Sequence, residues 1–350
     1  MDTDNKYMQR CLQLAKIGLG NTYSNPMVGS VIVHNGRIVG EGFHHRAGEP
    51  HAEVNAINSV KDKSLLRAST LYVNLEPCAH YGKTPPCSLL IKESGIPKVV
   101  VGCTDTFSEV AGKGIEMLRE AGADVKVGVL KDESRELNKR FFTFHEKQRP
   151  YVILKWAQTL DGFIDIDRDK ENYGQPTWIT NEIAKKLVHK WRSEEQAILV
   201  GTNTAIKDNP SLTTREWSGN SPVRILVDRM GRVPQTHHIL NGEVETIVFT
   251  SVHKEESAKI RFVNIDFDQN IVPQILTELH SKHLQSVIIE GGKQILESFI
   301  DANLWDEARV FIGNKIFKAG VEAPKLKALP ISEEEVGNSR LQYMRNFSAK

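Results

Sequence analysis

The sequence predicts an α/β protein of two domains. Its 350 residues are many for one hydrophobic core, because a domain usually holds about 100–200. Apolar strand patterns alternate with helix patterns, which is typical of mostly parallel sheets flanked by helices. The alternation stops at the polar residues 139–150, which end in Pro150, and then begins again. We therefore predict one domain over residues 1–147 and a second over residues 148–350.

The composition excludes several classes of protein. With 45 basic and 44 acidic residues the net charge is +1, so no overall field attracts nucleic acid or an anionic membrane. No run approaches the roughly 20 apolar residues of a membrane span, and the first residues lack the apolar core of a signal peptide. The four cysteines are interpreted as metal ligands or core thiols. We expect a cytoplasmic protein that binds neither nucleic acid nor a membrane.

The first domain opens with an amphipathic helix over residues 4–18. A β-hairpin follows, because Asn35-Gly36 supplies the positive φ angles of a type I′ turn between two apolar runs. Pro50 suits the first position of the next helix, which would place His51 and Glu53 in its first turn. Further strands are predicted at residues 70–75, 99–102 and 125–129, and further helices from residue 87, at 114–121 and at 132–145.

The chemistry of this domain is predicted by His51, Cys78 and Cys87. One imidazole and two thiolates form a three-ligand tetrahedral site for Zn²⁺ whose fourth position is open to water. Zn²⁺ lowers the pKa of such a water to about 7, and Glu53 can carry protons beside it without binding the metal. These residues match the signature of zinc-dependent deaminases, which hydrolyse an amino group from an sp² ring carbon.

The alternative is a structural zinc site. Such a site is normally closed by four protein ligands, and His80 is the obvious fourth candidate. His80 lies only two residues from Cys78, which is awkward for the geometry, and Glu53 would have no purpose. The pattern therefore favours a catalytic site. Cys11 and Cys103 are interpreted as core thiols.

The second domain repeats the α/β pattern. Gly291-Gly292 lies between a strand and a helix, where backbone N–H groups can meet a phosphate, although a simple tight turn explains it about as well. The full G-x-G-x-x-G motif is absent, so a Rossmann domain is disfavoured. Strands are predicted at residues 151–156, 197–201, 223–227, 246–249, 262–265, 286–289, 308–312 and 341–344, and helices at 181–191, 272–280 and 294–300.

Three motifs of the first domain resemble the deaminase half of the bifunctional riboflavin-biosynthesis deaminase/reductase family. They are Asn25-Pro26-x-Val28-Gly29, His51-Ala52-Glu53 and Glu76-Pro77-Cys78-x-His80-x-Gly82-Lys83-Thr84-Pro85-Pro86-Cys87. Eight residues separate the two cysteines, whereas nucleic-acid deaminases usually have Cys-x-x-Cys. The resemblance implies a cytidine-deaminase-like αβα sandwich and a substrate site lined by Asn25, His44, His80, Lys83 and Thr84. Independently, a lysine and a threonine in a glycine-containing loop suit a phosphate.

The second domain resembles the reductase half of the same family, whose fold is like dihydrofolate reductase. The matching stretches include Thr159-Leu160-Asp161-Gly162, Trp178-Ile179-Thr180 and Glu290-Gly291-Gly292. One departure is Pro176, which stands where the family usually has a serine and cannot provide its hydroxyl. The resemblance implies NADPH contacts at Gln158, Trp178, Thr204, Asp208 and Gly292, and substrate contacts at Arg192, Leu212, Arg215 and Glu290.

The expected function is therefore bifunctional. The first domain would hydrolyse 2,5-diamino-6-(5-phosphoribosylamino)pyrimidin-4-one by zinc-dependent deamination, and the second would reduce the ribosyl group of the product to ribityl with NADPH. We also expect a homo-oligomer. Two alternatives are a nucleic-acid base deaminase, which would need a basic surface and stacking aromatics, and a second domain that serves only as a scaffold.

Overall fold

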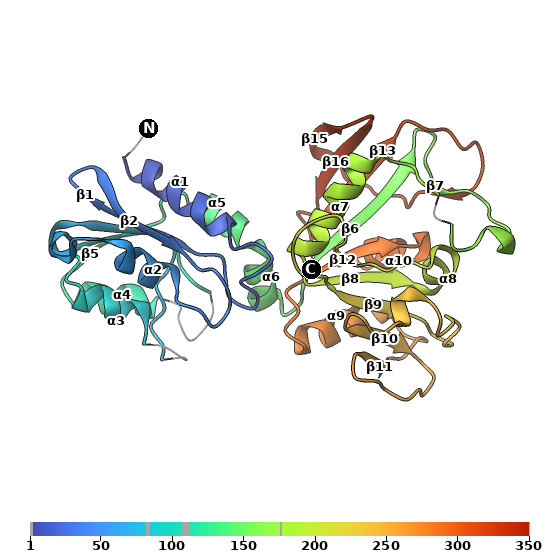
Figure 1. The fold of residues 1–350 in the computed structure, drawn as a ribbon, viewed down its shortest axis with the longest axis horizontal. Coiled ribbons are helices and arrows are strands. Elements are labelled where there is room, and N and C mark those ends of the chain that lie inside the picture. Colours follow the sequence, from blue (N-terminus) through green and yellow to red (C-terminus); the bar gives the residue numbers. More distant parts are fainter. Residues whose placement is uncertain (1–2, 82–84, 107–111, 176, 350) are drawn as a thin grey trace. The chain divides into compact units, whose positions relative to one another are not determined.

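The structure is a computed structural model that describes residues 3–81, 85–106, 112–175 and 177–349. The chain divides into two compact units, Met1–Lys147 and Gln148–Lys350, which are called the first and the second unit below (Figure 1). Within the described ranges, no helix is both long enough and apolar enough to cross a membrane.

The first unit is built on a five-stranded sheet in the order β2-β1-β3-β4-β5. Strand β1 is antiparallel to β2 and β3, whereas β3, β4 and β5 are parallel. The predicted hairpin is confirmed, with Asn35 at φ 47° and Gly36 at φ 74°. The strands are β1 (Gly29–His34), β2 (Arg37–Phe43), β3 (Thr70–Leu75), β4 (Lys98–Cys103) and β5 (Asp124–Val127).

Helices cover both faces of this sheet, so the predicted αβα sandwich is confirmed (Figure 1). Helix α1 packs with Met8 against Val31 on one face. Helices α2, α3 and α4 pack on the other face, where Ile32 and Ile91 enter a separate core, because successive strand residues point to opposite sides. The helices are α1 (Thr3–Lys16), α2 (Ala52–Ser59), α3 (Cys87–Glu93), α4 (Lys113–Glu120), α5 (Lys131–Leu137) and α6 (Lys139–Lys147), with a 3₁₀ turn η1 (Lys63–Ala68).

The prediction of one helix over residues 132–145 is wrong, because the structure has two helices that meet at Asn138. Asn138 has φ −98° and ψ 22°, outside helical geometry. Its side chain accepts a hydrogen bond from Met27 N at 2.8 Å and donates one to Met27 O at 2.9 Å. The break therefore ties these helices to the segment that carries Asn25.

The second unit contains a nine-stranded sheet in the order β11-β10-β9-β8-β12-β6-β13-β16-β15. Neighbours from β11 to β13 are parallel, and β16 and β15 add two antiparallel strands. The strands are β6 (Tyr151–Thr159), β8 (Ala197–Gly201), β9 (Val223–Val227), β10 (Thr246–Thr250), β11 (Ile260–Asn264), β12 (Ser286–Gly291), β13 (Glu307–Gly313), β15 (Pro330–Val336) and β16 (Ser339–Arg345), with a separate pair β7 (Phe163–Asp165) and β14 (Val321–Glu322).

Helices also cover both faces of the second sheet, which confirms the predicted α/β class. Ile289 packs on the side of α9 and α10, and Ile288 packs on the side of α7 and α8. The helices are α7 (Glu182–Glu194), α8 (Thr202–Asp208), α9 (Ile271–Ser281) and α10 (Lys293–Asp301), with 3₁₀ turns η2 (Lys170–Asn172) and η3 (His238–Leu240).

The end of the chain is more regular than the sequence indicates. The predicted strand at residues 341–344 is confirmed as part of β16, whereas β15 has no clear strand pattern in the sequence. Only Val336 of β15 is buried, and Glu333, Glu334 and Glu335 are exposed. A charged, exposed strand is typical of a sheet edge, where the burial that produces an alternating pattern is missing.

Candidate functional site

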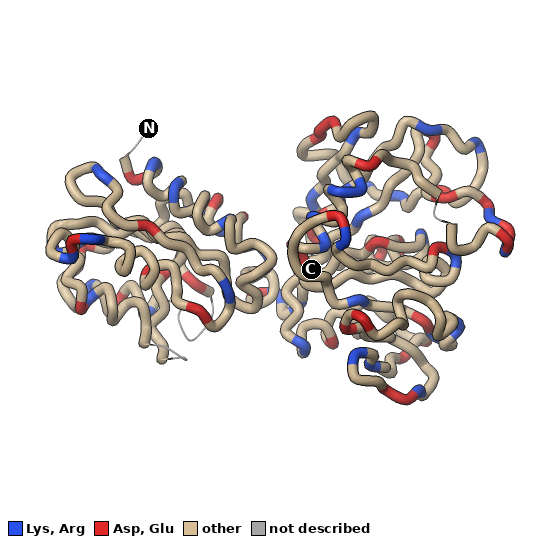
Figure 2. Tube along the Cα trace, viewed as in Figure 1, with Lys and Arg blue, Asp and Glu red and all other residues tan. Residues whose placement is uncertain are grey.

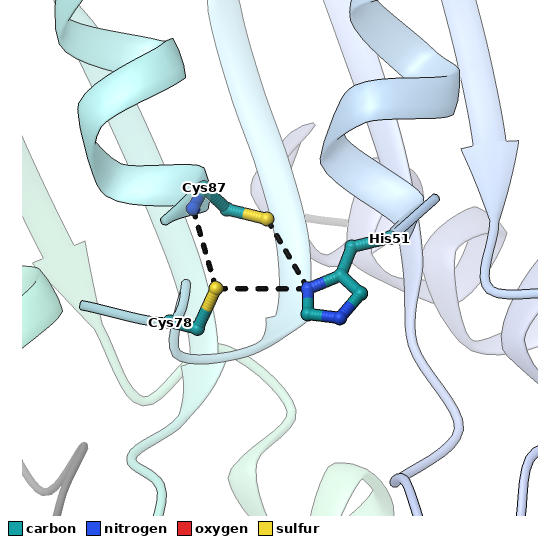
Figure 3. Close-up of side chains that lie close together, drawn as sticks. All are labelled: His51, Cys78 and Cys87. Carbon is teal, nitrogen blue, oxygen red and sulfur yellow. Dashed lines mark hydrogen bonds between the residues drawn. The ribbon is translucent and has the colours of Figure 1, made fainter. Parts of the chain in front are cut away.

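Three metal-binding side chains meet where α2 and α3 begin (Figure 3). His51 is the N-cap residue of α2, Cys87 is the first residue of α3, and Cys78 lies in the loop after β3. The prediction that Pro50 is the first helical residue is wrong by two positions. His51 has an extended backbone, with φ −71° and ψ 166°, so the helix begins only at Ala52.

The spacing of the three side chains fits a tetrahedral zinc ion. His51 Nδ1 lies 3.6 Å from Cys78 Sγ and 3.4 Å from Cys87 Sγ. Bonds of about 2.1 Å to nitrogen and 2.3 Å to sulfur at a tetrahedral angle place these atoms about 3.6 Å apart. The three residues can therefore hold Zn²⁺ with little movement.

The electrostatics favour a thiolate at Cys78. Hydrogen bonds from the Cys87 thiol, the His51 ring and the Cys87 N–H outweigh burial and lower the pKa of Cys78 to about 4. The Cys87 N–H lies 3.2 Å from Cys78 Sγ at the start of α3. The hydrogen bond with Cys78 and burial raise the pKa of Cys87. When a metal ion binds, it takes the place of the proton that lies between the Cys78 and Cys87 sulfur atoms.

Glu53 lies in the first turn of α2 and is buried. Burial, assisted by the charge of Cys78, raises the pKa of Glu53 to about 7. Its side chain also interacts with Cys87, so the carboxyl group borders the metal site. A carboxyl group that changes protonation near pH 7 is suited to proton transfer.

Glu76 also supports the metal site, although its sequence context gives no sign of this role. Its buried carboxylate accepts main-chain hydrogen bonds from Asp105 at 3.2 Å, Gly112 at 3.0 Å, Gly114 at 3.1 Å and Ile115 at 3.4 Å. Three of these donors lie at the start of α4, where a carboxylate is favoured. Glu76 thus fixes the chain two residues before Cys78.

Asn25 and His44 lie together beside the metal ligands. Asn25 Nδ2 donates to His44 Nε2 at 3.1 Å, and His44 Nδ1 then donates to Pro50 O at 3.2 Å. The His44 and His51 rings meet edge to face, with centroids 5.2 Å apart. Asn74 anchors the Asn25 segment by accepting a hydrogen bond from Gly29 N at 2.8 Å and donating one to Met27 O at 3.1 Å.

The other predicted residues of this site are less defined. His80 is exposed on the loop after Cys78. Lys83 and Thr84 lie outside the described residues, so their expected role in phosphate binding stays a prediction.

The second unit brings Arg192, Glu290 and Lys155 together. Arg192 Nη2 lies 2.8 Å from Glu290 Oε2, and Lys155 Nζ lies 3.8 Å from Glu290 Oε1. Burial raises the pKa of Glu290, but the charges of Arg192 and Lys155 outweigh it and lower that pKa to about 2. Within the described part of the chain, Glu290 Oε1 and Arg192 Nε have no hydrogen-bond partner, so both can meet a polar ligand.

Lys155 is a site residue to which the sequence analysis assigned no role, although it belongs to a stretch that resembles the reductase half. Burial lowers its pKa, although Glu290 opposes the shift. The signal was present in the sequence, because a lysine in an apolar strand needs a partner. The sequence does not reveal that this partner is Glu290 on the neighbouring strand.

Residues 212–216 form a segment that lies beside Arg192. Leu212 is buried at φ 53°, an unusual conformation for leucine. Arg192 Nη1 donates to Thr213 O at 3.4 Å, and Arg215 Nη1 donates to Thr213 Oγ1 at 3.3 Å. The four predicted substrate residues, Arg192, Leu212, Arg215 and Glu290, therefore belong to linked segments.

Gly291 and Gly292 pass close to Thr204 of α8. A Cβ atom on Gly291 would lie 2.9 Å from Thr204 Cγ2, and one on Gly292 would lie 3.2 Å from Thr204 Oγ1. Gly292, at φ 79°, is the N-cap residue of α10. Two side-chain-free residues before a helix, beside a threonine hydroxyl, fit a nucleotide phosphate.

The remaining predicted NADPH residues make different contacts. Asp208 pairs with the buried Arg168 at 2.7 Å. Gln158 accepts a hydrogen bond from Trp156 Nε1 at 2.8 Å. Trp178 is 49% exposed, with Lys185 Nζ 5.0 Å from its ring centroid, so its face can receive a planar ligand. Pro176 lies outside the described residues.

The two sites define a class of protein: a zinc-dependent deaminase joined to a reductase. Residues 1–103 match the family described as "Cytidine and deoxycytidylate deaminase zinc-binding region". Residues 150–326 match the family described as "RibD C-terminal domain". The chain belongs to the RibD family of bifunctional deaminase/reductases of riboflavin biosynthesis.

Curated relatives and solved structures support this assignment over nearly the whole chain. The riboflavin biosynthesis protein RibD of Aquifex aeolicus is 42% identical over 95% of this chain and 93% of its own. RibD of Escherichia coli is 35% identical over 93% and 91%. A crystal structure from Thermotoga maritima is 38% identical, with a TM-score of 0.89 over 98% of this chain and 99% of that chain. An Acinetobacter baumannii RibD structure is 31% identical, with a TM-score of 0.89 over 98% of both chains.

The family assignment confirms the predicted cofactors, Zn²⁺ and NADPH, and a small-molecule substrate. It decides between the two deaminase alternatives in favour of riboflavin biosynthesis. The charges agree, because Figure 2 shows basic and acidic residues interspersed along the trace of each unit. A nucleic-acid deaminase would be expected to carry an extended basic surface instead.

Proposed function

We propose that the chain catalyses two consecutive reactions on one phosphorylated pyrimidine. A deaminase domain of residues 1–147 hydrolyses the 2-amino group of 2,5-diamino-6-(5-phosphoribosylamino)pyrimidin-4-one. A reductase domain of residues 148–350 then reduces the ribosyl group of the product with NADPH. The observation that carries this proposal is the three-ligand group of His51, Cys78 and Cys87 beside Glu53. The similar Thermotoga maritima structure is that of a "diaminohydroxyphosphoribosylaminopyrimidine deaminase/ 5-amino-6-(5-phosphoribosylamino)uracil reductase".

The residues of the deaminase site divide the work of hydrolysis. Zn²⁺, held by His51, Cys78 and Cys87, supplies the Lewis acidity that makes water a nucleophile near neutral pH. Glu53 accepts the proton of the attacking water at its carboxylate and gives it to the ring nitrogen. Glu53 then takes the proton of the new C–OH group and delivers it to the amino group, so that the C=O bond forms, the C–N bond breaks and ammonia leaves. Its pKa near 7 suits both directions of transfer.

Asn25 and His44 orient the pyrimidine in this proposal. Their mutual hydrogen bond leaves the Asn25 carbonyl oxygen free to accept from a ring N–H or amino group. Burial lowers the pKa of His44, so it stays neutral at physiological pH. We assign the 5-phosphate to Lys83 and Thr84, with His80 at the rim.

The residues of the reductase site hold an opened sugar. When bound, NADPH would supply the hydride that reduces C1′ of the imine form of the ribosylamine, and the nitrogen would gain a proton. Lys155 is placed to provide that proton, since burial lowers its pKa and Glu290 holds it in the site. Glu290 Oε1 can also accept a hydrogen bond from the ring amino group or a sugar hydroxyl.

Two arginines receive the phosphate of the second substrate. Arg192 and Arg215 both border Thr213, and guanidinium groups bind phosphate through paired hydrogen bonds. We assign Leu212 to the same site, where its buried side chain supports the Thr213 segment. NADPH is held by Gln158, Trp178, Thr204, Asp208 and Gly292.

The proposed function also concerns the oligomeric state of the protein and its place in the cell. We propose a homo-oligomer that works in the cytoplasm and needs no nucleic-acid or membrane partner. Free cysteines support a reducing compartment, because thiolate zinc ligands are lost on oxidation.

Two half-reactions test the proposed function separately. With the diaminopyrimidinone and no NADPH, the protein should release one equivalent of ammonia. With the deaminated intermediate and NADPH, the NADPH absorbance should fall. Normal ammonia release with flat absorbance would mean that the second domain is only a scaffold. No ammonia release together with an unchanged NADPH absorbance would reject the proposed pyrimidine substrate.

A further inference from the structure

A buried histidine, His189, joins α7 to the segment that carries Arg215. His189 is only 2% exposed, yet it takes no part in the reactions proposed above. Its Nδ1 accepts a hydrogen bond from the main-chain N–H of Arg215 at 3.0 Å, and Glu216 N lies 3.5 Å away. Because Nδ1 is the acceptor, the ring proton of the neutral imidazole is on Nε2.

The same helix holds this segment at two further points. Arg192, three residues after His189 and on the same helix face, donates to Thr213 O at 3.4 Å. Lys185, four residues before His189, pairs with Glu216 at 2.6 Å. The segment therefore docks along one face of α7, with His189 at the point nearest to the Arg215 main chain.

The segment needs such support because its backbone is strained. Leu212 has φ 53°, a left-handed backbone region that a leucine adopts only where its surroundings impose it. The buried Arg224 contributes from another side, by donating to Ser211 O at 3.4 Å. Removal of one contact would let the segment relax, and the Arg215 side chain would move with it.

The charges around His189 keep it in the accepting form. Arg192 interacts with it from α7, Arg215 and Glu216 from the docked segment, and Glu290 from β12. Lys185 lies one turn earlier on α7 and pairs with Glu216. Burial, followed by the charges of Arg192 and Arg215, lowers the pKa of His189 to about 4, against smaller opposing effects of Glu216 and Glu290. The geometry requires the same form, because a protonated Nδ1 could not accept the Arg215 N–H.

We propose that His189 is a positioning residue of the reductase site, which fixes the main chain of Arg215 and so aims its guanidinium group at the substrate phosphate. This inference rests on the proposed role of Arg215. His189 itself touches neither substrate nor NADPH. It therefore determines how well the enzyme binds a phosphorylated substrate, and leaves hydride transfer unchanged.

The test compares a phosphorylated and a dephosphorylated substrate. The deaminated intermediate and its 5′-hydroxyl counterpart are reduced by the full-length protein, and KM and kcat are measured for each. His189→Leu removes the acceptor, whereas His189→Asn keeps an oxygen acceptor close to the position of Nδ1. Lys186→Leu is the matched control, since Lys186 is exposed on the same helix. Ammonia release by the first unit reports on the integrity of each preparation.

The expected result is a split between KM and kcat. His189→Leu should raise KM for the phosphorylated substrate about 10- to 100-fold, in line with the loss of one buried hydrogen bond. It should leave kcat and the KM for the dephosphorylated substrate unchanged, and His189→Asn should restore most of the affinity. Combined with Arg215→Ala, His189→Leu should add little, because both act through one group.

Other outcomes overturn the inference in distinguishable ways. An unchanged KM in His189→Leu, or an equal rise for both substrates, rejects His189 as a positioning residue. An unchanged KM in Arg215→Ala rejects the proposed role of Arg215, and the inference with it. If His189→Leu does not fold, His189→Gln replaces it. The side-chain oxygen of glutamine lies one bond beyond the position of Nδ1, so this variant also loses the acceptor and should produce the same split between KM and kcat.

Discussion

Gly114 offers a test of how the protein shapes its metal site. Gly114 is the second residue of α4, and a Cβ atom at this position would lie 2.0 Å from the carbonyl oxygen of Pro77. Carbon and oxygen atoms that are not bonded stay about 3.3 Å apart, so Gly114→Ala must push the two segments apart by about 1.3 Å. Pro77 directly precedes the zinc ligand Cys78.

The size of this displacement predicts a defect in zinc binding. Zinc coordination tolerates deviations of about 0.2 Å, well below the forced movement. Gly114 N also donates to Glu76 at 3.1 Å, so the same change loosens the support of the Cys78 loop. We expect Gly114→Ala to dissociate zinc about 10- to 100-fold faster, as for changes in the shell behind metal ligands. Overpacking should also destabilise the first unit by about 1–3 kcal/mol.

The assay is zinc transfer to a chromogenic chelator, with ammonia release measured in parallel. NADPH oxidation with the deaminated intermediate reports on the second unit and should not change. Gly122→Ala is the matched control, because Gly122 has φ 88° and open space around its Cβ position. It should cost about 1 kcal/mol of backbone strain and leave zinc in place. Wild-type zinc dissociation in Gly114→Ala would refute the proposed link between α4 and the metal ligand.

Three further predictions concern the catalytic groups. Glu53→Gln should keep stoichiometric zinc and lose about 10²- to 10⁴-fold in the rate of ammonia release, since the proton carrier is removed; retained activity would mean that the proton carrier is misassigned. Dipicolinate should abolish ammonia release and spare NADPH oxidation, and loss of both activities would show that zinc supports the whole chain. Because the pKa of Glu290 is lowered from 4.5 to about 2, it stabilises the second unit above pH 4.5, and this contribution is lost as the pH falls toward 2. Urea unfolding should show a loss of roughly 3 kcal/mol over that range, and Glu290→Gln should flatten the dependence; an unchanged slope would contradict the ion-pair assignment.

The sequence predicts the metal ligands because their chemistry is local. His51, Cys78 and Cys87 are chemically specific side chains, and each occurs directly after a proline in the sequence. The structure adds only the distances of 3.4 and 3.6 Å that fit a tetrahedral ion. Strands such as β3, which coincides with the predicted residues 70–75, are likewise specified by local apolar residues, here Leu71-Tyr72-Val73 and Leu75.

The contacts that support the sites could not be predicted, because their partners are distant in the sequence. Glu76 binds main-chain groups 29 to 39 residues away, and Arg192 meets Glu290 98 residues later. His189 looks like an ordinary helix residue until the Arg215 segment is placed beside it. Main-chain hydrogen bonds of this kind depend on the tertiary structure and leave no motif.

The errors in secondary structure have the same origin. The helix pattern continues through Asn138, and only its bonds to Met27, 111 residues away, break the helix there. Strand β15 is held by pairing with β16, and its exposed glutamates hide it from a search for alternating apolar residues.

The most direct test of the two-step account is the mass of the product. With the diaminopyrimidinone alone, the protein should produce one species heavier by about 1 Da, because NH is replaced by O. With NADPH present, a gain of about 2 Da more should follow, from one hydride and one proton. Glu53→Gln with NADPH should leave the substrate mass unchanged. A species heavier by about 2 Da without prior deamination would contradict the order of the two reactions.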